Sequence, residues 1–263
     1  MGGLRRKQMF VPSFTKSTLD LADLCARELW RGKSYQKDVL TISDEELLLD
    51  FSSPIYKNAL KINKPYKSSI TADVVKKFIN VAMPAMNLSV NGTDYIGGIK
   101  KLNRDVPKLI QPSISKAHSV DVYELAEQII FQLGSEFHIA TNKSFLVLAT
   151  RILFFATPHL PIFNYSDPLA KALGLPLNRQ TESLPIFNEL MRIGLEENWS
   201  YLKQYQMPFL SNKEQDEKIW HLARDSGWWQ RRVLDLACVI TLTNAIPKPV
   251  LIKLNKTLPN RFF

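Results

Sequence analysis

The segment from residue 141 to residue 174 holds the side chains best suited to chemistry. It reads TNKSFLVLATRILFFATPHLPIFNYSDPLAKALG, a very apolar helix followed by a proline-rich turn. Lys143 and Arg151 lie in the apolar part, where a cation must reach water, pair with an acid or act on a ligand. Asn164 and Asp167 follow in the turn. A carboxylate there can activate water or stabilise positive charge, and a lysine of lowered pKa can act as a nucleophile, although helix capping alone also selects an aspartate.

Two adjacent tryptophans suit contact with nucleic acid. They occur in the stretch GWWQRR at residues 227–232, which opens a helix. Adjacent residues of a helix face different directions, so at most one of Trp228 and Trp229 is expected in the same core. The other is then available for stacking on a base, or it fills an interface between lobes.

The two arginines of this stretch suit contact with phosphate. Arg231 and Arg232 follow the tryptophans, and a guanidinium can bind a phosphate through two hydrogen bonds. The alternative is structural, with one of the arginines paired with Asp225 or Asp235. Both interpretations are open at the level of the sequence.

A glycine-containing loop at residues 87–98 is a further candidate for base contact. Its glycines allow close approach of the backbone, and Asn91 and Tyr95 can bond to or stack on a base. A plain β-turn connection explains the same residues.

Common enzyme motifs are absent from the sequence. There is no Walker loop, no GxGxxG, no HExxH and no GxSxG. The four histidines are dispersed, so neither a metal nor a cofactor is expected. They are His118, His138, His159 and His221.

Segment 141–174 resembles the C-terminal half of the 8-oxoguanine-glycosylase-like DNA glycosylases of the helix-hairpin-helix superfamily. In that family a helix with a catalytic lysine leads into a turn with an essential aspartate, and bacterial members have a turn like P-I-Y-D-S. Here the turn reads PIFN and continues as YSD, with Asn164 at the place of the aspartate. Lys143 lies 21 residues before Asn164, which fits the spacing of the lysine. Residues 138–142 stand where the family has a glycine-rich hairpin.

The resemblance implies a DNA glycosylase that flips a modified or damaged base out of double-stranded DNA and hydrolyses its N-glycosidic bond. Asp167 would stabilise the positive charge that builds on the sugar, and Asn164 would position water or the flipped nucleotide. Lys143 is the candidate nucleophile for a strand-cleaving lyase step, and Arg151 could fill the same cationic place or contact DNA. Some bacterial relatives excise glucosylated hydroxymethylcytosine from phage DNA, so phage defence is expected beside ordinary base-excision repair.

Helical periodicity predicts a mainly α, two-lobed bundle with few or no strands. Ser17 and Asp121 are expected N-caps, Asp167 is expected to cap a short helix, and Gly32 and Gly134 are expected stops. β alternation is confined to residues 87–99 and 250–254. The predicted helices cover residues 18–31, 71–83, 122–134, 142–157, 168–174, 183–205, 212–225 and 226–243.

The charge is concentrated in the first half of the chain. The 263 residues carry 34 basic and 25 acidic side chains, a net charge of +9. Residues 1–118 hold 19 basic and 11 acidic side chains, against 15 and 14 in residues 119–263. We expect a basic N-terminal lobe at 1–118 and a helical lobe with the site at 119–263, packed as one unit, with double-stranded DNA as the partner.

Cysteine content and hydropathy favour the cytoplasm. Cys25 and Cys238 are too few for a disulfide scaffold. The longest apolar stretch, residues 144–156, is interrupted by Arg151 and falls short of the roughly 20 residues that cross a bilayer. No membrane contact, exported segment or obligate protein partner is expected.

Two other functions fit parts of the sequence. In a non-enzymatic DNA-binding accessory protein, Asp167 would be only a helix cap and Asn164 would mark lost catalysis. An α-helical protein-interaction scaffold would instead expose an apolar patch. Only the glycosylase predicts abasic sites in DNA.

Overall fold

The computed structural model describes residues 10–32, 43–60, 69–82, 96–115, 121–137, 146–176, 180–211 and 217–243. The regular elements in these ranges are all α-helices, which confirms a mainly α fold. They are α1 Lys16–Arg31, α2 Asp44–Ala59, α3 Ala72–Ala82, α4 Ile96–Arg104, α5 Val106–Ile114, α6 Val122–Glu136, α7 Leu146–Ala156, α8 Asp167–Ala172, α9 Gln180–Glu197, α10 Trp199–Leu202, α11 Glu217–Asp225 and α12 Trp228–Thr243.

Several helix ends follow from the capping residues. α1 ends as predicted at Gly32, whose φ of 58° is a left-handed conformation that glycine adopts without strain. Its N-cap, however, is Thr15 and not Ser17. Asp121 caps α6 as predicted, accepting hydrogen bonds from the backbone N–H groups of residues 123 and 124. α6 then continues past Gly134 to residue 136.

The prediction of a cap at Asp167 is wrong by one residue. The N-cap of α8 is Ser166, whose hydroxyl accepts from the backbone N–H of Leu169, and Asp167 is the first residue of the helix. An acid in the first turn is favoured there by the helix dipole.

Three helices were not predicted, namely α2, α4 and α5. Two of them, α2 and α5, contain an internal proline, at Pro54 and Pro112, a residue that disfavours the interior of a helix. Residues 96–99, expected to continue a β alternation, form the start of α4 instead. The other residues of the two expected β segments, 87–95 and 250–254, lie outside the described ranges.

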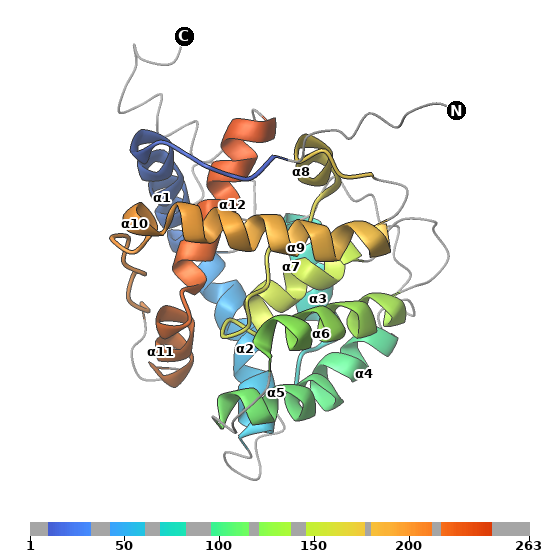
Figure 1. Cartoon of the computed structure of the whole chain (residues 1–263). Helices are drawn as coiled ribbons and strands as arrows, with labels where there is room; N and C mark the ends of the chain where they lie inside the picture. Colours follow the sequence, from blue (N-terminus) through green and yellow to red (C-terminus); the bar gives the residue numbers. More distant parts are fainter. Residues whose placement is uncertain are drawn as a thin grey trace, which may run out of the picture.

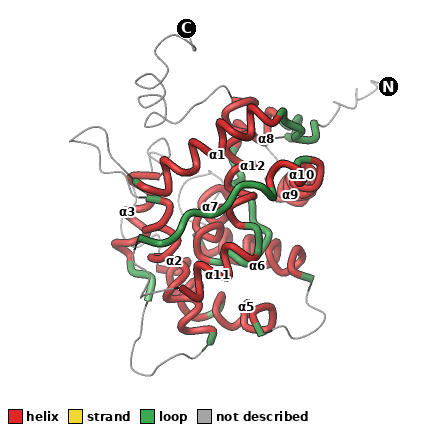
Figure 2. Tube along the Cα trace, turned by 90° about the vertical axis from the view of Figure 1, so that its left-hand side faces the viewer, coloured by secondary structure: helices red, strands yellow, loops and turns green. Residues whose placement is uncertain are grey.

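The helices pack around one continuous hydrophobic core (Figure 1). α9 crosses the front of the molecule over α7, and α3 lies behind. The view from the side places α7 and α12 between α3 on one side and α9 with α10 on the other (Figure 2). α1 packs along α12, and α2 packs on α7, so helices from both sides of residue 118 share this core.

Both tryptophans of the GWWQRR stretch lie in the core, which corrects the prediction that only one of them could. Trp228 and Trp229 are each 0% exposed. Trp228 donates to the backbone carbonyl of Phe154 at 2.8 Å, and Trp229 donates to Asp23 Oδ1 at 2.9 Å. The ring of Trp30 packs edge-on against both of them. Several helices pack on different sides of α12, so the side chains of Trp228 and Trp229 point in different directions and are still both buried. Neither ring is exposed to stack on DNA.

The buried role of Trp229 predicts a stability effect. Trp229→Phe keeps an aromatic ring but removes a donor from the buried Asp23 carboxylate and leaves a small cavity. We expect the free energy of unfolding, measured in urea, to fall by about 2–3 kcal/mol.

The control is Trp199→Phe, because the Trp199 side chain is 44% exposed. We expect a change below about 0.5 kcal/mol there. A Trp229→Phe protein of unchanged stability but weaker DNA binding would contradict this assignment.

Candidate functional site

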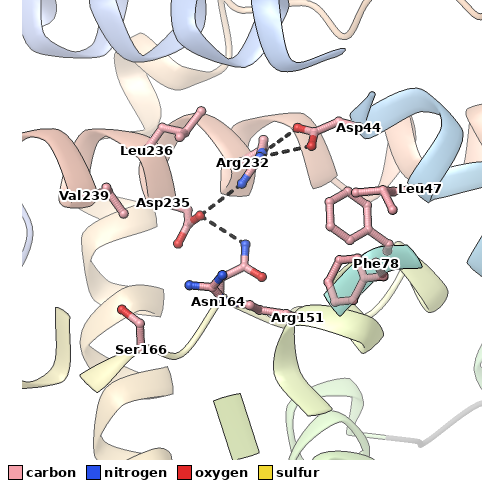
Figure 3. Close-up of a pocket in the computed structure, with 11 residues that line it drawn as sticks. Asp44, Leu47, Phe78, Arg151, Asn164, Ser166, Arg232, Asp235, Leu236 and Val239 are labelled. Carbon is pink, nitrogen blue, oxygen red and sulfur yellow. Dashed lines mark hydrogen bonds and ion pairs between the residues drawn. The ribbon is translucent and has the colours of Figure 1, made fainter. Parts of the chain in front are cut away.

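A cavity of about 160 Å³ lies where α2, α3, α7 and α12 meet the turn that follows α7 (Figure 3). Its polar lining comes from two cations, two acids, an amide and a hydroxyl, and its apolar lining includes two phenylalanines. The lining residues are Asp44, Leu47, Phe78, Arg151, Phe155, Asn164, Ser166, Arg232, Asp235, Leu236 and Val239.

The guanidinium of Arg232 is held between two buried acids. Its Nε lies 2.7 Å from Asp44 Oδ2, its Nη2 lies 3.1 Å from Asp44 Oδ1, and its Nη1 lies 3.4 Å from Asp235 Oδ2. Burial alone would lower the pKa of Arg232, but the two carboxylates outweigh it and raise the pKa. The arginine is therefore charged, and it joins the first turn of α2 to the middle of α12.

Asp235 also holds the amide of Asn164. Asn164 Nδ2 donates to Asp235 Oδ2 at 3.0 Å, across 71 residues of sequence. The two residues are 8% and 4% exposed. The second oxygen of each side chain, Oδ1, is buried and accepts no hydrogen bond within the described structure. Two acceptors at this cavity thus remain available to a ligand or to water.

The protonation of Asp235 is shifted by its surroundings. Burial raises the pKa of this carboxyl, while Arg232, the hydrogen bond from Asn164 and the charge of Arg151 act in the opposite direction. Burial also lowers the pKa of Arg151. A carboxyl of raised pKa in a partly apolar pocket is typical of groups that exchange protons in catalysis.

The turn that carries Asn164 is fixed on both sides. The backbone N–H of Tyr165 donates to the hydroxyl of Thr150 in α7, and the ring of Tyr165 packs edge-on against Phe187 of α9 at 5.0 Å. Burial, with Asp167 nearby, raises the pKa of Tyr165 to about 12, so its hydroxyl stays neutral. These contacts hold Asn164 at the cavity.

The structure brings together some of the predicted site residues. Asn164, Arg151 and Arg232 all line the cavity. Asp167 does not line it, although its neighbour Ser166 does. Lys143, Asn91 and Tyr95 lie outside the described residues.

Arg231 is buried inside the protein, which contradicts the prediction that it contacts phosphate. Arg231 is 3% exposed and donates to the backbone carbonyls of Pro158 and Ser226 at 2.6 Å and 2.8 Å. It thereby ties the turn after α7 to the start of α12. For Arg232, the structural alternative of pairing with Asp235 is confirmed.

Two acids of the site were not predicted as functional residues. The sequence suggests Asp235 only as an ion-pair partner of a nearby arginine, and it suggests no role for Asp44. The spacing of Arg232 and Asp235 by three residues indicates that they share a helix face. No local signal connects Asp44 to α12, since 188 residues separate it from Arg232.

No protein-family model, curated protein or solved structure matches the chain. Within the described ranges, no cluster of three or more His, Cys, Asp or Glu side chains is arranged to hold a metal ion. Among those same residues, no helix combines the length and the apolar character needed to span a bilayer.

The Arg232 network predicts a large and pH-dependent stability effect. Arg232→Met leaves Asp44 and Asp235 buried without their cation, so we expect a loss of about 3–5 kcal/mol in the free energy of unfolding at pH 7. Burial already raises the pKa of Asp235, and losing the opposing charge of Arg232 raises it further in the variant. Protons then favour the folded state, and the loss should be smaller at pH 5 than at pH 7.

The matched control is Arg192→Met, because Arg192 also pairs with two acids, Glu189 and Glu196, but on the surface. We expect a far smaller loss there. Urea unfolding of both variants at the two pH values makes the comparison, and equal losses would contradict the buried network.

A second buried network lies at His159 in the turn after α7. Tyr56 of α2 hydrogen-bonds to His159 Nδ1, and the hydroxyl of Ser113 of α5 lies 2.8 Å from His159 Nε2. Burial, together with the charge of Arg231, lowers the pKa of His159 to about 3. The ring is therefore neutral near pH 7 and joins the turn to two helices.

His159 predicts a loss of stability in mild acid. Its unfolded pKa is about 6.5, so between pH 6.5 and pH 3 the unfolded state binds a proton that the folded state does not. This residue should cost the wild type about 1–2 kcal/mol between pH 7.5 and pH 5. His159→Gln should show a shallower dependence in urea unfolding over the same interval, and parallel curves for the two proteins would contradict the assignment.

Proposed function

We propose that the protein is a DNA glycosylase that receives a flipped base in the cavity between α2, α3, α7 and α12. The observation that carries the proposal is the meeting of two parts of the sequence at this cavity. Asn164 and Arg151 come from the segment that resembles DNA glycosylases. Asp235 comes from α12, and its Oδ1 accepts no hydrogen bond from the residues that the structure describes.

The size of the cavity suits a single planar ring. Cavities of roughly 150 Å³ hold a benzene ring in other proteins, and this one measures about 160 Å³. Phe78 and Phe155 supply apolar walls. Figure 3 shows Phe78 to one side of the cavity, with Asn164 and Asp235 toward the other. Apolar walls with a few convergent polar groups are typical of small-ligand sites.

The reaction needs a negative charge next to the sugar. Cleavage of an N-glycosidic bond develops positive charge on the deoxyribose, and a carboxylate beside it stabilises that charge and deprotonates the attacking water. Asp235 fits this role better than Asp167, because Asp235 lines the cavity and Asp167 does not. Asn164 Oδ1 would orient the water or a donor group of the base.

The remaining parts of the proposal come from the sequence. The net charge of +9 favours association with DNA. Lys143 is the candidate nucleophile if the enzyme also cleaves the strand. Relatives suggested by the resemblance make glucosylated hydroxymethylcytosine in phage DNA one substrate to test, beside damaged bases.

The first experiment is base release from a panel of DNAs. The panel contains undamaged DNA, uracil and 8-oxoguanine duplexes, and phage DNA with glucosylated hydroxymethylcytosine. Abasic sites in one DNA would identify the base, and strand breaks without alkali would indicate a lyase step. If the protein binds these DNAs and leaves every one intact, it is a DNA-binding accessory protein and the glycosylase proposal fails.

On a DNA that is cleaved, Asp235→Asn should lower the single-turnover rate by at least about 100-fold, because the carboxylate is lost while the shape is kept. Asp73→Asn, an exposed acid on α3, is the matched control and should keep the wild-type rate. Asp167→Asn separates the two acids and should retain most activity. A reversed order, with Asp167→Asn inactive and Asp235→Asn active, would move the catalytic carboxylate to Asp167.

A further inference from the structure

The side-chain amide of Asn164 is fixed in one orientation at the cavity. Its Nδ2 donates to Asp235 Oδ2 at 3.0 Å, and the same oxygen accepts from Arg232 Nη1 at 3.4 Å. A reversed amide would place Asn164 Oδ1 against an oxygen that already acts as an acceptor. Figure 3 shows the amide nitrogen of Asn164 turned to Asp235 and its oxygen turned away from that carboxylate. Asn164 therefore offers its acceptor oxygen to the rest of the cavity.

This acceptor oxygen is buried and has no donor among the described residues. Asn164 is 8% exposed, and its Oδ1 accepts no hydrogen bond from the described part of the chain. Asp235 Oδ1, on the neighbouring side chain, is in the same condition. A buried acceptor without a donor is unfavourable, so the cavity favours a ligand that brings an N–H or O–H group to it.

The backbone on both sides of Asn164 is held as firmly as its amide. Phe163 and Tyr165 are 1% and 0% exposed, and the backbone N–H of Tyr165 donates to the Thr150 hydroxyl at 3.3 Å. An acceptor held in this way cannot turn to suit a ligand that brings another acceptor. Sites built around a fixed hydrogen bond discriminate strongly against analogues that cannot make it.

The size and the walls of the cavity narrow the class of ligand further. A volume of about 160 Å³ between Phe78 and Phe155 suits one aromatic ring better than the two fused rings of a purine. Among the single-ring bases, cytosine carries an exocyclic amino group, which is a donor. Thymine and uracil carry a carbonyl oxygen at the same ring position, which is an acceptor.

We infer that Asn164 selects a base of the cytosine type by accepting a hydrogen bond at Oδ1 from the exocyclic amino group. The inference rests on the proposed function, because that function supplies a flipped base as the ligand and leaves Asp235 Oδ1 to the attacking water. Thymine or uracil would bring a carbonyl oxygen toward Asn164 Oδ1 instead, and the one N–H on its ring lies between two carbonyls. The other carbonyl, at ring position 2, is common to all three bases and does not distinguish them.

The test compares three small rings that carry a methyl group where the sugar would be attached. They are 1-methylcytosine, 1-methyluracil and 1-methylpyrimidin-2-one, which lacks the amino group but keeps the ring and its carbonyl. Each is titrated into the intact protein by isothermal titration calorimetry. We expect 1-methylcytosine to bind at least about tenfold more tightly than either of the others. This comparison uses the wild type alone and does not depend on a variant that folds.

A substitution then assigns the preference to Asn164. Asn164→Leu removes the acceptor at similar volume, and the preference for 1-methylcytosine should fall to within about twofold. Asn188→Leu is the matched control. Asn188 is also 8% exposed, its Nδ2 donates to Glu127 at 3.2 Å and its Oδ1 accepts no hydrogen bond from the described residues, but it does not line the cavity. Asn188→Leu should keep the full preference.

Three results would overturn the inference. They are binding of 1-methyluracil as tight as that of 1-methylcytosine, no binding of any of the three rings, and an unchanged preference in Asn164→Leu.

Base release from the glycosylase panel is measured on the same proteins and separates the two proposals. A preference for 1-methylcytosine that depends on Asn164, without base release from any DNA, leaves the recognition standing and rejects the glycosylase. Release of uracil or 8-oxoguanine from DNA, with no preference for 1-methylcytosine, does the opposite.

Discussion

A buried guanidinium requires neutralising partners, and the arrangement of the candidate site follows from how Arg232 meets that requirement. Asp44 reaches it from α2, and Asp235 reaches it from one turn further along α12. Asp235 Oδ2 accepts hydrogen bonds from both the Arg232 guanidinium and the Asn164 amide. The charge of Arg232 therefore positions α2, α12 and the turn after α7 relative to one another. Asp235 Oδ1 is left without a hydrogen bond from the described residues, so a ligand or water can donate to it.

Local signals were sufficient for most of the fold. Glycine at position 32 and aspartate at position 121 fixed helix ends because capping depends only on neighbouring backbone groups. α2 was missed although Ser43 and Glu46 form a complete capping box, a pattern readable from sequence. An internal proline, Pro54, works against a helix assignment here, but in the protein the helix continues through it, with most of its residues buried in the core.

The site was only partly predictable, for reasons of distance along the chain. Asn164 and Arg151 stood out because their polarity contrasts with the apolar residues around them, and both line the cavity. Asp44 gave no such contrast, since it begins a helix with two further acids and its partner is remote in sequence. The expectation for Trp228 and Trp229 was wrong in a different way. The helical period shows that adjacent side chains point in different directions, but it cannot show that other helices bury both directions.

The pairing of α1 with α12 has a consequence for how the protein is made. These helices pack along one another although they lie at the two ends of the described chain, separated by residues 32–227. At synthesis rates of about 5–20 residues per second, a ribosome finishes α12 roughly 10–40 s after α1. During that interval the apolar face of α1, including Leu19 and Trp30, lacks its final partner. A nascent chain of this protein is thus a natural client for chaperones that shield exposed hydrophobic segments until translation ends.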